Sequence, residues 1–269
     1  MTFLNRLASD GGAPARRNSK SRTTATDFLT RIRTEMAKTR GLFSASSAER
    51  PAQPAQRFDL LRRELSERWP QTLERFRAEF ERVAGVFHRV ATAAEVPAAL
   101  ERICRERDAR RLVAWPAEDL GVAIAPALAG AGIAVESMPR APVADTERRR
   151  LRSVIAEADL GVTGADLAVA ETGTLVLVSA AGRPRSTSLL PPCHVAVFDR
   201  EALLESLEHV GLALEAWHEG VPPAERGAVI NFITGPSRTA DIELTLTRGV
   251  HGPKEIHAIF VDGGLSRHG

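Results

Sequence analysis

The chain has 269 residues, two cysteines and a formal net charge of +2. Its 43% apolar and 26% charged residues are the composition of an ordinary folded domain, and two cysteines exclude a disulfide framework. No apolar run approaches the roughly 18 residues of a transmembrane helix, and no apolar signal segment opens the sequence, so we expect a cytoplasmic protein.

The first 56 residues differ in charge from the remainder. They carry ten Lys and Arg against four Asp and Glu, whereas the rest carries 26 against 30. Residues 1–26 are rich in Ser, Arg, Gly and Ala, a short amphipathic helix is expected from Asp27 to Met36, and residues 41–55 have linker composition. We therefore predict a basic, partly disordered leader over residues 1–56 and a folded domain over residues 57–269. No basic stripe with interleaved aromatic rings follows, and Tyr is absent, so nucleic-acid binding is not expected.

From Arg57 onward the pattern first predicts a helical segment that Pro70 interrupts. Short β-like runs then alternate with helical segments, which predicts an α/β fold with a mostly parallel sheet flanked by helices. The predicted strands are residues 86–90, 111–115, 133–136, 174–178, 194–198, 229–234 and 256–261. The predicted helices are residues 96–107, 119–129, 147–156 and 199–214.

A single carboxylate, Glu171, stands among apolar residues between the uncharged run 167–170 and the β-branched run 174–178. Thr172 and Gly173 can reverse the chain there, because glycine adopts positive φ without steric cost. A carboxylate in apolar surroundings has a raised pKa and can act as acid, base or nucleophile. The structural alternative is that Glu171 caps backbone N–H groups of its own hairpin.

Two arginine-containing loops follow predicted strands, and in open α/β sheets ligands bind beyond the carboxyl ends of strands. In the first loop, Arg183 and Arg185 can hold a carboxylate or phosphate, or lie in a solvated loop. In the second, Gly235, Ser237, Arg238 and Thr239 read as a turn and a helix start capped by Ser237, which would expose anion-binding N–H groups. Asp241 and Glu243 follow, and they can share a metal only if the segment is extended.

His251 lies in a turn-rich segment before the last strand, where it either transfers protons or bonds loop backbone. We expect no metal bound by this chain, because two cysteines cannot supply four thiolates and Cys193 and His194 point to opposite faces of a strand. No dinucleotide-binding glycine motif follows a strand. We expect Glu171, Arg183 and the loop 235–239 to converge at the carboxyl edge of the sheet.

Four segments in this order, ADLAVAETGTLVLVS, RSTSLLPPCHVAV, ITGPSRTADIE and RGVHGPKEIHAIFVDG, resemble the LUD domain of lactate utilization proteins, most closely the lactate utilization protein C group. The resemblance covers residues 159–263. It implies a fold similar to the NagB/RpiA/CoA transferase-like fold and a role in oxidising L-lactate to pyruvate beside iron–sulfur partner subunits. Two alternatives remain open: a stand-alone coenzyme A transferase-like or isomerase-like enzyme that uses Glu171, and a non-catalytic scaffold.

Overall fold

The computed structural model of the chain describes residues 25–38, 51–219, 229–240, 246–249 and 251–266. The chain divides into two compact units, one within residues 1–50 and one from residue 51 onward. In the first unit the described residues form helix α1 (Ala25–Lys38), which contains the predicted short helix. Leu29 and Ile32 of this helix are exposed. The predicted leader boundary at residue 56 stays a prediction.

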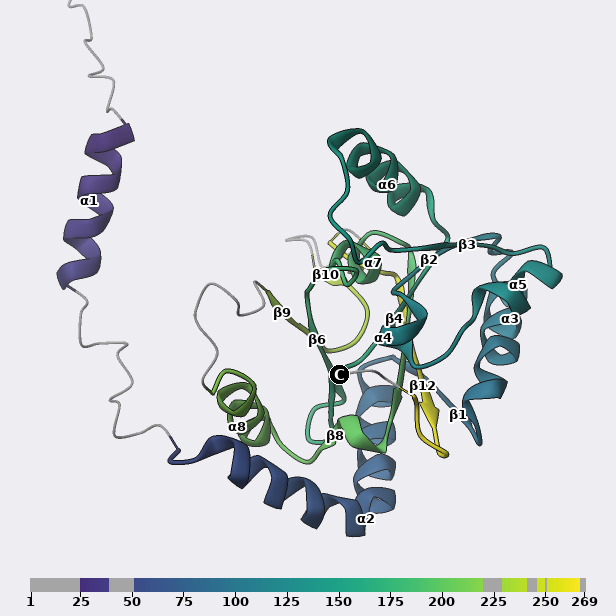
Figure 1. Ribbon diagram of the computed structural model, residues 1–269, viewed down its shortest axis with the longest axis horizontal. Helices are drawn as coiled ribbons and strands as arrows, with labels where there is room; N and C mark the ends of the chain where they lie inside the picture. The colour runs from purple at the N-terminus through teal and green to yellow at the C-terminus, as the bar shows by residue number, and fades with distance from the viewer. Residues whose placement is uncertain (1–24, 39–50, 220–228, 241–245, 250, 267–269) are drawn as a thin grey trace, which may run out of the picture. The chain divides into compact units, whose positions relative to one another are not determined.

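The second unit is built on a six-stranded sheet in which every pair of neighbouring strands is parallel. This confirms the predicted α/β class with a mostly parallel sheet (Figure 1). The strand order is β1–β12–β7–β4–β2–β3. The strands are β1 (Val86–Val90), β2 (Arg111–Ala114), β3 (Ala134–Ser137), β4 (Leu160–Gly164), β7 (Cys193–Asp199) and β12 (Glu255–Val261).

A second, four-stranded sheet has the order β8–β5–β6–β9. Its strands are β5 (Leu167–Val169), β6 (Thr174–Val178), β8 (Leu203–Leu204) and β9 (Ile230–Ile233). Strands β5 and β6 form the antiparallel hairpin that the sequence predicts around Thr172 and Gly173. A separate antiparallel pair joins β10 (Arg238–Ala240) to β11 (Leu246–Arg248).

The helices of this unit are α2 (Pro54–Arg82), α3 (Val96–Glu106), α4 (Ala117–Leu120), α5 (Ala125–Gly130), α6 (Asp145–Glu157), α7 (Ser186–Leu189) and α8 (Leu207–Trp217). Helix α2 is kinked where Pro70 interrupts the predicted pattern, and Arg68 has the non-helical angles φ −123° and ψ 16°. A proline inside a helix removes one backbone hydrogen bond and crowds the preceding turn, which explains the kink.

Aromatic residues attach the second half of α2 to one face of the six-stranded sheet. Trp69 stacks on Phe260 with ring centroids 5.6 Å apart, and Phe76 meets Phe198 edge-on at 5.3 Å. On the opposite face, Ile103 of α3 and Leu128 of α5 belong to the same buried core.

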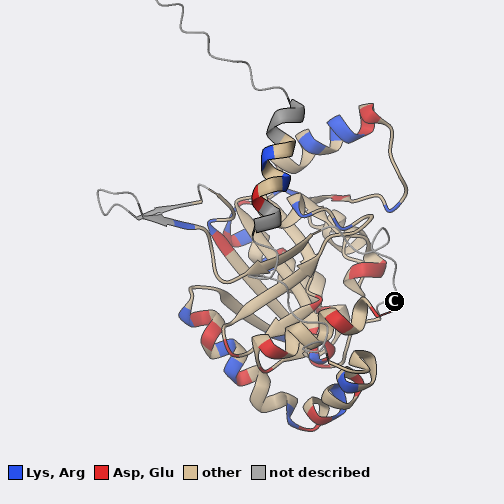
Figure 2. Ribbon diagram, turned by 90° about the vertical axis from the view of Figure 1, so that its left-hand side faces the viewer, with Lys and Arg blue, Asp and Glu red and all other residues tan. Residues whose placement is uncertain are grey.

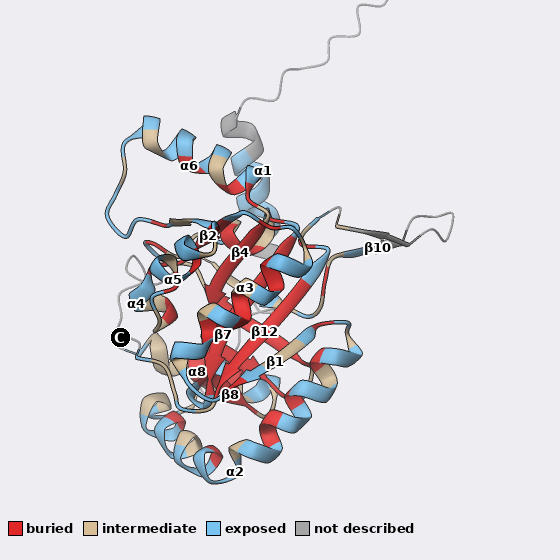
Figure 3. Ribbon diagram, turned by 90° about the vertical axis from the view of Figure 1, so that its right-hand side faces the viewer, coloured by how far each residue is buried: buried red, intermediate tan, exposed pale blue. Residues whose placement is uncertain are grey.

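Buried residues are concentrated in the central strands, as Figure 3 shows. Charged residues instead lie mainly on the helices (Figure 2). Of the helices described, none combines the length and the apolar character needed to cross a membrane.

Two predicted helices are wrong in extent, and strands β4, β8, β10 and β11 were not predicted. Residues 199–214 form a short 3-10 turn, strand β8 and only then α8, because Asp199 caps the turn by accepting from the N–H of Glu201. Residues 119–129 are divided between α4 and α5, because Gly121 ends α4 with φ 72°. Strand β4 was missed because it contains glycine. A Cβ at Gly161 would lie 1.9 Å from the carbonyl oxygen of Thr187, so α7 packs directly on this strand.

Candidate functional site

A compact polar cluster lies at the carboxyl ends of the parallel strands, around Arg183. Its guanidinium lies over the indole ring of Trp115, 4.7 Å from the ring centroid, and donates to Asp166 at 2.5 Å. The second carboxylate oxygen of Asp166 accepts from the backbone N–H of Val178 at 2.7 Å. Trp115 directly follows β2 and Asp166 follows β4, so the ends of two strands and the loop after β6 meet here.

Two hydrogen-bond donors in this cluster have no partner among the residues that the structure describes. They are Nε1 of Trp115 and Nε of Arg183, and both atoms are buried. A buried donor without an acceptor costs about 1–3 kcal/mol, so such groups usually have a partner. Two donors from a stacked pair of side chains, one of them on a cation, are the chemistry that binds a carboxylate or phosphate group. The cluster therefore has unused capacity for an anionic acceptor.

The loop that carries Arg183 packs tightly against its neighbours. Gly182 has φ 77°, and a Cβ atom there would lie 2.8 Å from Cγ of Arg140 and 3.0 Å from Cγ of Pro116. Arg140 in turn donates two hydrogen bonds to Asp119, at 2.6 and 3.1 Å. This bidentate pair fixes the segment after β3 against α4, and it holds the wall on which the Arg183 loop rests.

A cavity of about 120 Å³ lies beside Trp115, at the carboxyl ends of β2 and β3. Its lining is mostly apolar and includes Trp115, Leu120, Ile124, Pro126 and Ser137. Pockets for drug-sized ligands have roughly 300–1,000 Å³. The cavity therefore fits a small metabolite rather than a nucleotide.

Glu171 lies in the turn between β5 and β6, as the sequence predicts, but its surroundings differ from the expectation. The residue is exposed, so the predicted apolar environment of its carboxylate is wrong. Its Oε2 accepts from the backbone N–H of Leu207 at 3.0 Å. Leu207 is the first residue of α8. Glu171 therefore stabilises the start of a different element, α8, rather than its own hairpin.

The structure separates Glu171 from Arg183. Asp166, the partner of Arg183, precedes β5, whereas Glu171 lies beyond the other end of that strand. Strand β5, three residues or roughly 10 Å long, lies between them, so the two residues are at opposite ends of this strand. The predicted convergence of Glu171 and Arg183 on one cleft therefore does not form.

Thr172 and Gly173 connect the hairpin to its neighbours. Three hydroxyl groups form a chain, from Thr172 to Thr174 at 2.7 Å and from Thr174 to Thr234 at 2.7 Å. Gly173 has φ 61°, and a Cβ atom there would lie 2.4 Å from the backbone nitrogen of Phe80. These contacts tie the hairpin to the residue after β9 and to α2, which is a structural role.

The loop that contains Gly235, Ser237 and Arg238 lies at the amino edge of the six-stranded sheet. Arg238 donates to the carbonyl of Val83 at 3.0 Å, and the N–H of Ser237 donates to Pro253 at 2.9 Å. Val83 precedes β1 and Pro253 precedes β12. The predicted position at the carboxyl edge is therefore wrong for this loop.

The helix start expected after Ser237 is also wrong. Residues 238–240 form strand β10, in which Thr239 is the Cα partner of Thr247. The hydroxyl of Ser237 accepts from the backbone N–H of His251 at 3.3 Å, and His251 itself is exposed. Asp241 and Glu243 lie outside the described residues. In the other predicted loop, Arg185 is exposed, so Arg183 alone joins the polar cluster.

Two histidines of the described residues, His194 and His257, are buried on the central strands. Nε2 of His194 lies 2.8 Å from the hydroxyl of Thr163, and burial lowers the pKa of His194 to about 3. His257 on β12 is 1% exposed, and burial lowers its pKa to about 4. Within the described chain, one group of potential metal ligands has its ligand atoms within 4.8 Å of one another: Cys193, Glu255 and His257.

Sequence reasoning missed Trp115, Asp119 and Asp166. Trp115 comes one residue after β2 and Asp166 two residues after β4, so the rule that pointed to the loop of Arg183 also applies to them. The signal for Asp166 depended on recognising β4, whose glycines hid it.

Residues 73–261, well over half of the chain, match the LUD domain. The chain belongs to the LUD domain family. Among its LUD relatives, Lactate utilization protein C of Halalkalibacterium halodurans is 44% identical over 117 residues, which are 43% of this chain and 49% of that protein. Lactate utilization protein C of Shouchella clausii is 41% identical over 106 residues, 39% of this chain and 44% of the relative. The match thus spans about half the length of these curated relatives.

A crystal structure of a DUF162 family protein from Deinococcus radiodurans is 25% identical in sequence, with a TM-score of 0.49. The match covers 71% of this chain and 97% of that one.

Proposed function

We propose that this LUD chain takes part in lactate utilization, as a cytoplasmic accessory subunit of a system that oxidises L-lactate to pyruvate with iron–sulfur partner proteins. The observation that carries the proposal is the 44% identity over 117 residues to a relative named Lactate utilization protein C. The match covers about half of that relative. The activity of the whole relative is therefore proposed for this chain and does not follow from the match alone.

We include partner subunits in the proposal because lactate oxidation needs a redox group. Removing two electrons from lactate requires a redox cofactor. An iron–sulfur cluster held by four thiolates needs more than the two cysteines of this chain. The clusters therefore belong to other polypeptides, and this chain contributes substrate handling or assembly.

The polar cluster at the carboxyl edge gives the chain a place to hold a small carboxylate. Arg183 Nε and Trp115 Nε1 are buried donors that have no acceptor among the described residues, and a cavity of about 120 Å³ adjoins Trp115. A carboxylate oxygen of lactate or pyruvate satisfies both donors while the rest of such a molecule occupies a small volume.

The competing proposal, acyl transfer through a Glu171 nucleophile, has less support. Glu171 is exposed, and its carboxylate accepts from the N–H of Leu207. A nucleophile needs a binding group within reach of the same small substrate, and Arg183 lies at the other end of the hairpin.

The biological test is deletion of the gene in its native host and growth on L-lactate, with pyruvate as the control carbon source. We expect growth to fail on lactate and to continue on pyruvate, and the intact gene to restore growth. A tagged chain purified from lactate-grown cells should bring with it proteins that contain iron and sulfide. Normal growth of the deletion strain on L-lactate contradicts the proposal.

The ligand test is calorimetry with L-lactate and pyruvate, with lactamide as a control that lacks the carboxylate. Trp115→Phe keeps an aromatic ring under Arg183 but removes the indole N–H. We expect affinity for the two acids to fall about tenfold, the equivalent of one hydrogen bond of about 1.4 kcal/mol. Equal affinity of the wild type and Trp115→Phe for both acids would remove this site from the proposal.

A further inference from the structure

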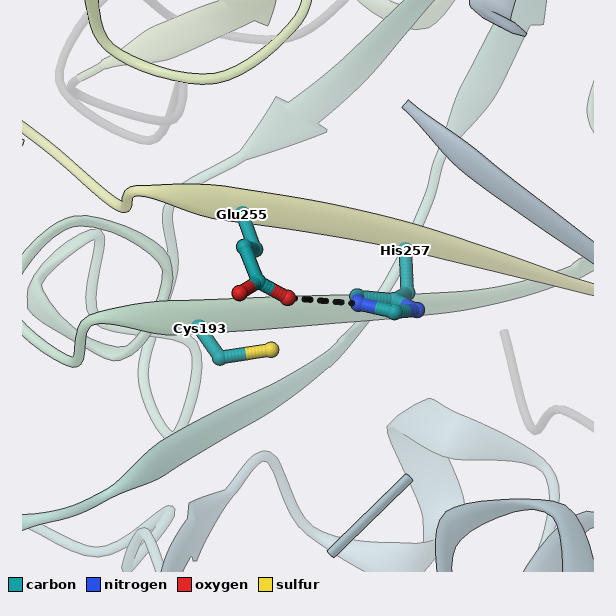
Figure 4. A group of neighbouring side chains, drawn as sticks. All are labelled: Cys193, Glu255 and His257. Carbon is teal, nitrogen blue, oxygen red and sulfur yellow. Dashed lines mark hydrogen bonds and ion pairs between the residues drawn. The ribbon is translucent and has the colours of Figure 1, made fainter. Parts of the chain in front are cut away.

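Side chains suited to binding a metal come together on the face of the six-stranded sheet that α3 covers. Cys193 begins β7, and Glu255 and His257 lie on β12. Glu255 and Cys193 are Cα partners in the parallel pair β12–β7, and His257 is two residues further along β12. Residues two apart on a strand share a face, so the three side chains extend to the same side of the sheet. Figure 4 shows the thiol, the carboxylate and the imidazole gathered in one place.

The three ligand atoms lie within 4.8 Å of one another. Around a zinc ion, ligand sulfur lies at about 2.3 Å and ligand nitrogen or oxygen at about 2.0–2.2 Å. Neighbouring ligands in a tetrahedral site are therefore somewhat closer together than here. Glu255 is the ligand that would have to move, because its side chain is 47% exposed, whereas Cys193 and His257 are buried in the core.

A second histidine orients the imidazole of His257. Its Nδ1 lies 2.9 Å from Nε2 of His88 on β1, and the two rings stack with centroids 5.2 Å apart. In one tautomer, Nε2 of His257 donates to Glu255 at 3.5 Å and Nδ1 accepts from His88; in the other, Nδ1 donates to His88 and Nε2 carries the lone pair that a cation needs. A histidine that ligates a metal with one nitrogen and hydrogen-bonds with the other is the common arrangement in metal sites.

Arg107 is the group that competes with a cation for Glu255. It donates to Glu255 through Nε at 2.7 Å, and also to Glu106 through a terminal nitrogen at 3.2 Å. If Glu255 turns to a divalent cation, Arg107 keeps Glu106 as its counter-charge. The cation is then balanced by one thiolate and one carboxylate, and no charge in the group is left unpaired.

We propose that Cys193, Glu255 and His257 bind a zinc-class divalent cation, with His88 as the hydrogen-bond partner of His257. Sulfur, imidazole and one carboxylate suit zinc, whereas magnesium and calcium prefer sites made only of oxygen. Three protein ligands leave a fourth position for water, on the exposed side next to Glu255. Binding releases the thiol proton of Cys193 to solvent. The cation joins β7 to β12 at the amino edge of the sheet.

The test uses the full chain without an affinity tag, stripped with a chelator and titrated with zinc chloride in a calorimeter. We expect one zinc per chain and a rise of the thermal midpoint on addition of zinc. Cobalt in place of zinc should give a thiolate-to-metal charge-transfer band in the near ultraviolet. Cys193→Ser should abolish that band, and His257→Gln should weaken binding at least tenfold.

Two further variants keep the test decisive if the buried substitutions disturb folding. Glu255→Gln changes an exposed side chain and should weaken zinc binding at least tenfold while the far-ultraviolet circular dichroism stays unchanged. Cys104→Ala, at the other buried cysteine, should bind zinc like the wild type. Absence of stoichiometric binding, or equal binding by the wild type and Glu255→Gln, overturns the proposal.

Discussion

Gly173 approaches α2 so closely that a Cβ atom on it would lie 2.4 Å from the backbone nitrogen of Phe80. Its φ of 61° adds a second reason why a side chain does not fit. We expect Gly173→Ala to lower the free energy of unfolding by about 2–4 kcal/mol, because the clash is with backbone that cannot move aside. Urea titration measures the change. Gly130→Ala is the control, since nothing lies within 4 Å of a Cβ there, and it should have little effect or stabilise slightly.

Asp166 joins Arg183 to the backbone of β6, so different replacements of Asp166 should lower the free energy of unfolding by different amounts. Asp166→Asn keeps an acceptor for Val178 N–H but removes the charge that faces Arg183, and should cost about 1–3 kcal/mol. Asp166→Ala leaves both partners unsatisfied and should cost more. Asp145→Asn is the matched control, because Asp145 pairs with Arg148 on the surface with its side chain 86% exposed, and its loss should be below about 0.5 kcal/mol. Equal losses for Asp166→Asn and Asp145→Asn would contradict the account.

Glu171→Gln should fold with nearly unchanged stability and should support growth on L-lactate. The amide oxygen can still accept from Leu207 N–H, and only the charge at the start of α8 is lost, which is typically a few tenths of a kcal/mol. Glu171→Ala removes the acceptor and should lower stability by about 1 kcal/mol. Thermal melts and growth curves measure the two effects. A Gln variant that is as stable as the wild type yet fails to grow on lactate would instead show that the carboxylate is functional.

Stability should fall with acidification, and His194 should account for part of the loss. Burial lowers the pKa of His194 to about 3, below its usual value of 6.5. Between these values the unfolded chain binds a proton that the folded chain does not, so the unfolding free energy decreases as pH falls below about 6.5, by at most about 1.4 kcal/mol per pH unit from this residue. Above pH 6.5, His194 does not contribute to the pH dependence of the unfolding free energy. Urea titrations from pH 7 to 5, with chelator present, should show a shallower decline for His194→Asn than for the wild type. Thr163→Val, which keeps the imidazole, should retain the wild-type slope.

Deletion of residues 1–50 should leave the urea midpoint of the remaining chain unchanged. These residues form a unit separate from the one that starts at residue 51. The deletion stops before α2, whose first turn contains a hydrogen bond from the N–H of Ala55 to Glu219. Deleting residues 1–56 instead removes that contact and should lower the midpoint. A large loss from the shorter deletion would mean that the first unit stabilises the second.

The sequence predicted those strands whose residue pattern is visible within the strand itself. Residues 86–90 and 174–178 were predicted with the observed bounds, and the apolar, β-branched run 174–178 specifies its strand directly. The same rule failed for β4, whose Gly161 is required by α7, more than 20 residues later in the chain. The helix expected over residues 199–214 failed because pairing of Leu203 and Leu204 with β5 overrides their helical pattern.

The site was harder to predict than the strands, because it depends on how the second sheet is placed. Arg183 was identified from its loop, but its partner Trp115 comes from a strand 68 residues earlier. Periodicity could not show that the hairpin separates Glu171 from Arg183, or that the loop at Gly235 meets Val83 at the amino edge. His88 and His257, 169 residues apart, meet only because β1 and β12 are neighbours.

The position of β12 between β1 and β7 has a consequence for synthesis of the protein. Strand β1 has β12 as its neighbour in the sheet, so it cannot pair until residue 261 has left the ribosome. Until then the emerging polypeptide presents two open strand edges, on β1 and on β7, which favour association with other chains. Premature termination before residue 255 should therefore leave an insoluble fragment rather than a smaller working domain.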